Sequence, residues 1–262
     1  MKGWAWVREG WAYRNVYYLL AWRDTKLRYK QTILGAMWAI LQPFLTMVLF
    51  TVVFGRVIGV PTDGIPYPVF YYAALLPWMY FSNTVAQSGL SLVSNARLIT
   101  KVYFPRSALP IAPALSGIID FGVGTLILIA MLGYYGLHPT WKLLLWPILV
   151  LMLASLSCTI GMMLAALNVR YRDVKHAVPF ILQLWLFATP IVYPVNIIPE
   201  YLRHLAYLNP LTGIVAAFRS ISVPNHDIDW SSLCISTLII MVLVIMSIAY
   251  FSKAEETLSD IV

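Results

Sequence analysis

The chain has 262 residues, of which 60% are hydrophobic and 11% are charged, and its formal net charge at pH 7 is +7. Soluble domains contain about half apolar and about a quarter charged residues, so this composition, with a mean hydropathy of +0.76, excludes a soluble globular protein. Repeated apolar runs of about 20 residues, without the alternation of a membrane β-barrel, predict an all-α polytopic membrane protein. Basic loops on one side of a membrane account for the positive charge, so no nucleic-acid partner is expected.

The N-terminal segment, residues 1–33, precedes the first apolar run. Its first ten residues have no short apolar core, so no cleavable signal peptide is expected. Further on, Tyr13, Val16, Tyr17 and Leu20 have the i, i+3, i+4, i+7 spacing of one helix face, with arginines and aromatics around them. This pattern predicts an amphipathic helix along the membrane surface, with basic groups toward lipid phosphates. A cytoplasmic helix packed on a partner fits the same pattern and stays open.

Six membrane spans are expected within residues 34–252, and residues 253–262 form a tail. The spans lie near residues 34–55, 69–93, 107–132, 142–167, 177–193 and 231–252. After the fifth span, Asn209-Pro210 splits two apolar helical stretches that are each too short to cross a membrane. Irregular backbone at membrane depth persists only where protein or water surrounds it. We therefore expect short re-entrant or interfacial helices between spans five and six, with an ordinary external loop as the alternative.

The distribution of Lys and Arg predicts the orientation of the spans. Of the 18 such residues, 14 lie in the N-terminal segment, in the loops after spans two and four, and in the tail. Basic loops stay in the cytoplasm, so both termini are expected there.

The loops after spans two and four mix basic with apolar residues. A loop that only marks topology has no use for Leu98, Ile99, Val102 and Phe104. These residues indicate a docking surface, and partial burial in the membrane interface is the alternative explanation.

Asp120 is the one acidic residue deep within a span. A carboxylate at that depth is costly and by default suggests a function. Its spacing offers a structural explanation, because small residues recur every four positions around it and let helices approach closely. These residues are Ala108, Ala112, Ser116 and Gly124. We favour the structural role, with channel lining or proton relay as the minority interpretation; the sequence names no partner for the carboxylate.

Aromatic residues are dense in spans one, two and five, and several lie near amide side chains. Ring faces stack on sugar rings while amides exchange hydrogen bonds with hydroxyls, so such a surface suits the passage of a glycan, although a lipid-facing ring is the commoner case. The candidate channel residues are Trp38, Gln42, Tyr71, Trp78, Tyr80, Phe81, Asn83, Gln87, Gln183 and Trp185.

Enzymatic motifs are absent from the sequence. No G-x-x-x-x-G-K-[ST] stretch occurs, so the chain is not expected to bind ATP by itself in the usual way. The four histidines lack metal-ligand spacing, so neither catalytic residues nor a metal site is expected.

Three segments together resemble a known family. Residues 20–55, residues 98–110 ("LITKVYFPRSALP") and residues 167–194 (beginning "LNVRYRDVKHAV") are similar to the membrane subunit of polysaccharide ABC exporters. These exporters belong to the type-2 ABC exporter family, which serves O-antigen, capsule and teichoic acid export. The resemblance covers nearly the whole chain.

The resemblance implies a transporter subunit of the cytoplasmic (inner) membrane of a bacterium or archaeon. A second copy of the chain and two copies of an ATP-binding subunit are then the partners, together with membrane lipids. ATP and magnesium belong to the partner subunit, and this chain has no cofactor of its own. The implied substrate is a glycan joined to a polyprenyl diphosphate lipid.

The resemblance also implies two sets of site residues. Those that couple to the ATP-binding subunit are Asn95, Arg97, Leu98, Lys101, Val102, Tyr103, Phe104 and Pro105 in one loop, and Arg170, Arg172, Asp173 and Lys175 in the other. On electrostatic grounds, the basic residues that meet the lipid diphosphate at the cytoplasmic entrance are Arg14, Arg23, Lys26 and Arg28.

Three other functions remain as alternatives. A type-2 exporter of drugs or small lipophilic molecules would share the layout but has less need of the aromatic density. An ion-coupled carrier should have paired ionisable groups at mid-membrane, and a lipid-linked glycosyltransferase should have clustered acidic residues or a metal-binding motif.

Overall fold

The computed structural model describes residue 8 and residues 10–30, 37–62, 64–137, 140–171, 173–223 and 226–261. Within these ranges the chain forms helices, turns and loops and no strand, which confirms the all-α class. The elements in chain order are α2 (Arg14–Lys30), α3 (Met37–Phe50), the π-helical η1 (Thr51–Val57), α4 (Tyr67–Ser94), α5 (Ala96–Ile99), α6 (Ala108–Tyr134), the 3₁₀ turn η2 (Trp141–Leu145), α7 (Trp146–Arg170), α8 (Val174–Ala188), the 3₁₀ turn η3 (Val195–Ile197), α9 (Glu200–Tyr207), α10 (Pro210–Ser222) and α11 (Trp230–Ile261).

Helices lie at all six positions where spans were predicted, but their composition differs. Four helical segments are long and apolar enough to cross a membrane, namely Ile40–Val57, Ala108–Tyr134, Trp141–Arg170 and Trp230–Glu255. Helix α8 has 15 residues and is therefore only about 22 Å long, short of the roughly 30 Å hydrocarbon core. Helix α4 is long but falls outside the apolar group. The protein is a multi-pass membrane protein, and the count of six spans stays a prediction.

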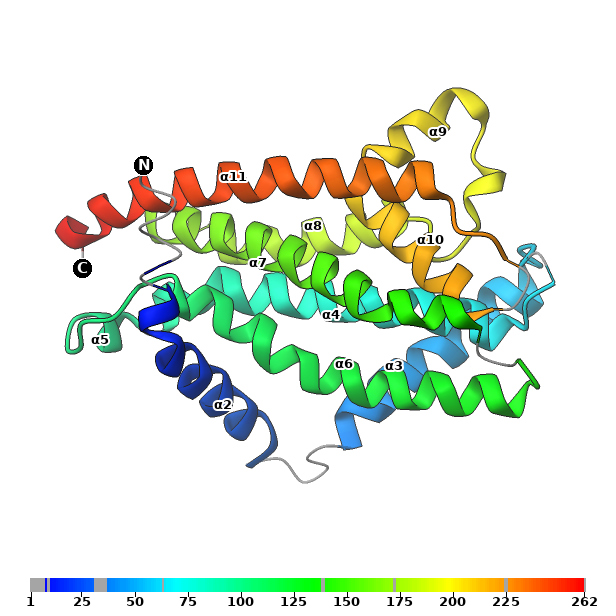
Figure 1. Cartoon of the computed structure of the whole chain (residues 1–262), viewed down its shortest axis with the longest axis horizontal. Coiled ribbons are helices and arrows are strands. Elements are labelled where there is room, and N and C mark those ends of the chain that lie inside the picture. Colours follow the sequence, from blue (N-terminus) through cyan, green and yellow to red (C-terminus); the bar gives the residue numbers. More distant parts are fainter. Residues whose placement is uncertain are drawn as a thin grey trace.

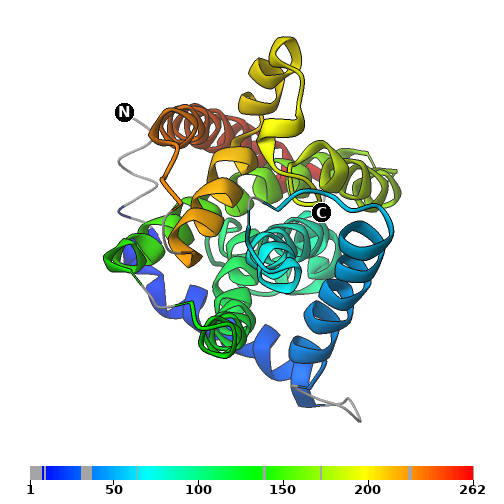
Figure 2. The same ribbon diagram turned by 90° about the vertical axis from the view of Figure 1, so that its right-hand side faces the viewer.

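Helix α4 is less apolar because other helices, and not lipid, surround it. It packs against α3, α6, α7, α8 and α10, and it occupies the middle of the bundle when the molecule is seen end-on (Figure 2). Its polar groups find partners inside the protein: Tyr72 and Tyr80 donate hydrogen bonds to main-chain carbonyls of α6, and Ser88 Oγ donates to the carbonyl of Pro110 at 2.6 Å. Burial by protein thus permits hydroxyl-bearing residues that a lipid-facing helix would avoid.

Small residues let neighbouring helices approach α4 closely. Ala108, Ala112 and Ser116 of α6 are buried, which confirms the predicted stripe as a packing surface. The stripe continues at Gly124, where an added Cβ would collide with the side chain of Leu76. On α7, a Cβ at Gly161 would lie 2.9 Å from Ser88 Oγ.

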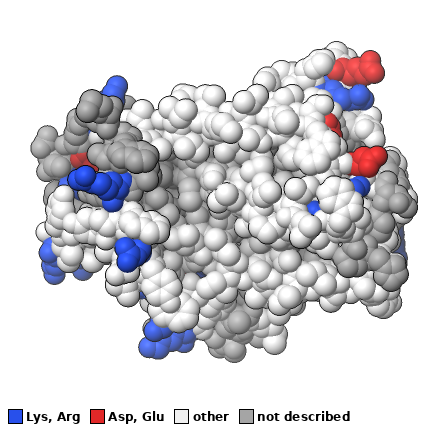
Figure 3. Space-filling view, in the orientation of Figure 1, with Lys and Arg blue, Asp and Glu red and all other residues white. Residues whose placement is uncertain are grey.

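The two ends of the bundle differ in charge. The start of α2, α5 and the C-terminal end of α11 lie at one end, and α9 lies at the other (Figure 1). Lys and Arg side chains gather at the end with α5, and a broad band without charged side chains separates it from the opposite end, which carries both acidic and basic groups (Figure 3). A basic end is what the positive-inside rule expects of the cytoplasmic side, and the cytoplasmic location of the termini stays a prediction.

The segment between α8 and α11 contains the two predicted short helices. They are α9 and α10, and the split at Asn209-Pro210 is confirmed; the Asn209 side chain caps α10 by accepting a hydrogen bond from the backbone N–H of Leu211 at 3.1 Å. Helix α10 is largely buried and packs on α4, α7 and α11, whereas α9 stands away from the bundle (Figure 2). Packing inside the bundle therefore buries α10, which is the more apolar of the two short helices.

Candidate functional site

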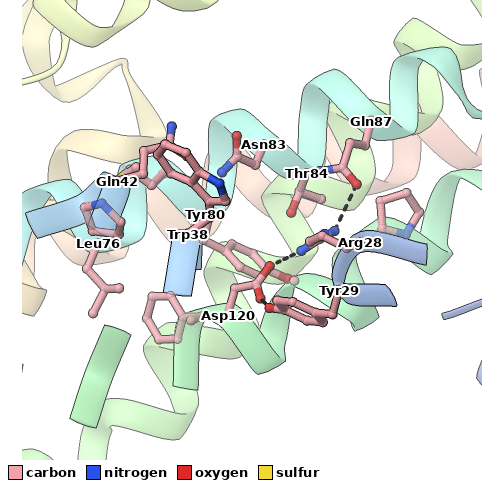
Figure 4. A pocket seen from close by; sticks show the side chains of 15 residues that line it. Arg28, Tyr29, Trp38, Gln42, Leu76, Tyr80, Asn83, Thr84, Gln87 and Asp120 are labelled. Carbon is pink, nitrogen blue, oxygen red and sulfur yellow. Dashed lines mark hydrogen bonds and ion pairs between the residues drawn. The ribbon is translucent and has the colours of Figure 1, made fainter. Parts of the chain in front are cut away.

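A cavity of about 380 Å³ lies where α2, α3, α4 and α6 meet. Rings and amides line it, as Figure 4 illustrates: Trp38 and Gln42 come from α3, Tyr80, Asn83 and Gln87 from α4. These five were predicted as channel residues, and the structure brings them together around one space. A second cavity of about 190 Å³, lined by Trp78, shares Gln42, Met79 and Asn83 with the first. The two cavities therefore adjoin along the groove between α3 and α4, and both carry polar and aromatic side chains.

An ion pair closes one side of the cavity. Arg28, near the C-terminal end of α2, donates from Nη1 to Asp120 of α6, and the hydroxyl of Tyr29 donates to the other carboxylate oxygen (Figure 4). The second guanidinium nitrogen, Nη2, donates to Gln87 Oε1 at 3.0 Å and to Ser116 Oγ at 3.4 Å. Three helices thus meet at one arginine, and Asp120 has the partner that the sequence could not name.

Helical periodicity explains why Arg28 points inward. The predicted face of the N-terminal helix is confirmed: Tyr13, Val16 and Tyr17 are half-buried and Leu20 is buried. The same face continues through Ala21 and Thr25, which are buried, and reaches Arg28 one turn later. Extending the predicted face by two turns would have placed Arg28 on the packed side of the helix.

Three of the other predicted channel residues, Tyr71, Phe81 and Trp185, pack in or against the protein core. Tyr71 is fully buried and contacts Phe50 and Phe70 edge-on. Phe81 is also fully buried and packs on Trp185, whose indole N–H donates to Asn209 Oδ1 at 3.1 Å. In the single chain these rings hold α4, α8 and α10 together, so their role is packing. Gln183, on α8, is exposed and does not line the groove.

The remaining basic residues of α2 point away from the cavity. Arg14 and Lys26 lie over the rings of Trp11 and Trp22. Arg23 pairs with Asp24 and donates to Asn95 Oδ1 at 3.1 Å, which joins α2 to the junction of α4 and α5. Of the four predicted diphosphate contacts, only Arg28 lines this cavity, and Arg14 lines the space on the other side of α2.

On its other side, α2 borders an apolar groove. This space of about 540 Å³ lies between α2 and α6, and Tyr17, Trp22 and Leu115 are among its lining residues. Ser116 lines the apolar groove and also accepts a hydrogen bond from Arg28. The ion pair therefore lies at the boundary between an apolar groove and a polar cavity.

The first predicted coupling loop is partly folded onto the chain. Asn95 occupies the N-cap position of α5 and its side-chain amide donates back to the carbonyl of Ser91 in α4. Arg97 and Lys101 are exposed, and Phe104 is 8% exposed. Leu98 packs in the same cluster as Phe104, which includes Leu20 and Ala21 of α2, and Pro105 is buried. By contrast, Val102 and Tyr103 are 53% and 85% exposed. Of the apolar residues in this loop, these two present the surface that a partner can contact.

The second predicted coupling loop joins α7 to α8 at the same end of the molecule. Arg170 ends α7 with its guanidinium over the ring of Tyr171, and Asp173 and Lys175 are exposed at the start of α8. Arg172 falls outside the described residues. The loop thus presents both signs of charge to solvent.

Known proteins of similar sequence match the chain over most of its length. The sequence profile of the family described as "ABC-2 type transporter" matches residues 15–223. The O-antigen export system permease protein RfbA of Myxococcus xanthus is 33% identical over 97% of this chain and 98% of its own length. RfbA of Klebsiella pneumoniae is 28% identical over 91% and 92%, and the polysialic acid transport protein KpsM of Escherichia coli is 24% identical over 90% and 92%.

Proposed function

The chain belongs to the ABC-2 type transporter family as a permease subunit, and we propose that it exports a polysaccharide across the cytoplasmic membrane while the glycan is joined to a polyprenyl diphosphate. The O-antigen and polysialic acid transporters that it resembles support a glycan as the substrate. The observation that carries the proposal is the groove in which Trp38, Tyr80 and three amide side chains surround one space. Ring faces pack on sugar rings, and amides exchange hydrogen bonds with hydroxyls at any register of a long polymer.

A permease of this family implies a separate ATP-binding subunit in the exporter. We propose a complex of two copies of this chain with two ATP-binding subunits, and magnesium with ATP in the latter. The exposed Val102 and Tyr103 in one loop and Asp173 and Lys175 in the other are available for the contact. Motion at these loops reaches the transport groove through α2, because Arg23 is bonded to Asn95 beside α5.

The substrate's diphosphate is proposed to bind along α2. Arg14 and Lys26 are exposed on this helix and attract anions to the membrane surface. Arg28 is the contact inside the groove, where a planar guanidinium suits two phosphate oxygens at once. The glycan would then follow the groove between α3 and α4 as ATP hydrolysis in the partner widens it.

The decisive experiment is transport by the purified complex in proteoliposomes. We expect a lipid-linked glycan to stimulate ATP hydrolysis and to become accessible on the far side of the membrane. Replacing Trp38 and Gln42 by Ala should reduce glycan transport while the complex still assembles.

Two results would contradict the proposal. Transport that continues without ATP would exclude an ABC exporter, and stimulation by small lipophilic drugs but not by the lipid-linked glycan would indicate a drug exporter instead. A matched control is Leu126→Ala, because Leu126 is exposed on α6 outside the lining of the groove.

A further inference from the structure

We propose that Asp120 is a resident substitute for the substrate's diphosphate, which displaces it from Arg28 and thereby frees the end of α2 from α6. This inference rests on the proposed function, and it assigns a role to a carboxylate that the transport scheme does not use. Asp120 is here a positioning residue: it holds Arg28 in the empty transporter and yields it when an anionic lipid arrives.

The ion pair of Arg28 and Asp120 is accessible to a ligand in the cavity. The side chains of Arg28 and Asp120 are each 27% exposed, and both line the cavity. Among the described residues that line it, Arg28 is the only basic one and Asp120 the only acidic one. An incoming anion therefore meets one guanidinium, whose charge one carboxylate already balances.

Asp120 lies far from the end of α6 at which the helix begins. Asp120 lies twelve residues after Ala108, the first residue of α6, so it is about 18 Å along the helix from that end. An unpaired charge at such a position within apolar helices is costly. Arg28 needs a counter-ion when no substrate is bound, and Asp120 supplies it.

A diphosphate is a stronger ligand for Arg28 than the side chains that now accept its hydrogen bonds. It carries more charge than a carboxylate and can accept two parallel N–H bonds from the guanidinium. At Nη2 it would replace only the neutral oxygens of Gln87 and Ser116. The Asp120 side chain is 27% exposed, so water can solvate the released carboxylate, and the hydrogen bond from Tyr29 breaks as well when the end of α2 moves away from α6.

Loss of the ion pair changes how the end of α2 is held against α6. Because Ser116 contacts Arg28 and also lines the apolar groove, the pair stands between the groove and the polar cavity. Exchange of Asp120 for a diphosphate loosens this boundary. An amphiphile can then keep its prenyl chain in the apolar groove between α2 and α6 while its head group enters the cavity. The polarity of the two compartments matches that of a prenyl diphosphate carrying a glycan.

The test is a binding measurement on the complete complex with its ATP-binding subunit, in phosphatidylcholine nanodiscs that add no anionic lipid. The probe is tritiated farnesyl diphosphate, with farnesol and inorganic diphosphate as competitors that separate the contributions of chain and head group. Asp120→Asn keeps the shape of the side chain and removes the competing charge. We expect it to tighten farnesyl diphosphate binding by about tenfold, because one unit charge next to Arg28 is lost.

Two further variants control for loss of the site and for surface charge. Arg28→Gln should lose most of the binding. Lys30→Gln removes a charge from the exposed last residue of the same helix and should leave binding nearly unchanged. If Asp120→Asn does not fold, Asp120→Ser replaces it, because serine continues the stripe of small residues that includes Ser116.

Movement of α2 is measured independently with spin labels at Leu27 and Ile118, which are exposed on α2 and α6 and do not line the cavity or the apolar groove. We expect the distance between the labels to increase when farnesyl diphosphate binds, and in Asp120→Asn without ligand. Unchanged or weaker binding by Asp120→Asn would overturn the inference, as would equal losses in Arg28→Gln and Lys30→Gln. If glycan transport is normal while these results are negative, only the role of Asp120 fails; if glycan does not stimulate ATP hydrolysis at all, the proposed function fails.

Discussion

Arg28 and Arg219 are both arginines within the helical bundle, but their acceptors differ. Arg219 of α10 is 8% exposed and donates to the main-chain carbonyls of Phe70, Pro190 and Ile191, with its guanidinium 3.8 Å above the ring of Phe70. Arg28 is held by side chains, among them the carboxylate of Asp120, at the edge of a cavity.

The difference has a physical consequence. The main-chain carbonyls of Phe70 in α4 and of Pro190 and Ile191 in the turn after α8 cannot leave without local unfolding, so they fix Arg219 and, through it, α10. A carboxylate on a separate helix can rotate away, and a ligand can take its place. The outer end, by which we mean the end of the bundle with α9 and α10, is therefore expected to be rigid. At the junction of α2 and α6, by contrast, a ligand can replace the acceptor of Arg28.

The largest effect on stability is expected for Arg219→Met. The change leaves several buried carbonyls without a donor, at a cost of about 1–3 kcal/mol for each unsatisfied group, so we expect a total on the order of 3 kcal/mol. Thermal unfolding of the protein in detergent measures the loss. Arg219→Lys should be intermediate, because one ammonium group cannot reach all the carbonyls that the guanidinium fork joins. Equal stability of the wild-type protein and Arg219→Met would show that the hydrogen bonds of Arg219 do not fix α10.

Gly213→Ala tests whether packing also fixes the outer end. A Cβ at this position of α10 would lie 2.6 Å from the main-chain oxygen of Ser232 on α11, so the two helices must separate. Overpacking of this kind costs about 1–3 kcal/mol. The matched control is Gly133→Ala, since nothing lies within 4 Å of a Cβ there. Thermal unfolding should distinguish the two variants, and equal unfolding temperatures would mean that α10 moves without cost.

A smaller effect is expected at the junction of α2 and α6. Arg28→Gln leaves Asp120 without its cation, but the pair is partly exposed, so we expect a loss of about 1 kcal/mol. The double variant Arg28→Gln/Asp120→Asn should recover most of it, because neither charge then lacks a partner. A double-mutant cycle of unfolding free energies measures this coupling. Absence of recovery in the double variant would show that Arg28 acts through contacts other than Asp120.

The smallest change in stability is expected for Asp173→Lys. The side chain is exposed at the start of α8, so unfolding should shift by no more than about 0.5 kcal/mol. Charge reversal at this position, or at Arg172, is nevertheless predicted to uncouple ATP hydrolysis from export. The measurement is the ratio of glycan exported to ATP hydrolysed by the reconstituted complex, which should fall several-fold. A normal ratio would remove this loop from the predicted contact.

The fold was largely predictable from sequence, whereas the site was predictable only in its parts. Apolar runs and the Asn209-Pro210 break predicted most helix bounds to within five residues, because hydropathy and backbone restriction act locally. The exception is α11, which continues through the predicted tail to Ile261. Trp38, Gln42 and Asn83 were identified as candidates from their chemistry alone. Tyr71 and Phe81 have similar chemistry but lie in the core, and no local property distinguishes a ring that faces a cavity from one that packs on other rings.

By itself, the sequence determined the helical class, the basic end with both termini and the amphipathic face of α2, since each follows from the spacing and charge of nearby residues. Only the tertiary structure decided that α4 lies in the centre, and that Arg28 meets Asp120 across 92 positions of the chain. That meeting depends on how α2 packs on α6, two helices that are far apart in the sequence. The physical reason is that the free-energy cost of burying a charge can be inferred from the apolar residues around it in the sequence, whereas the residue that offsets this cost lies far away in the chain.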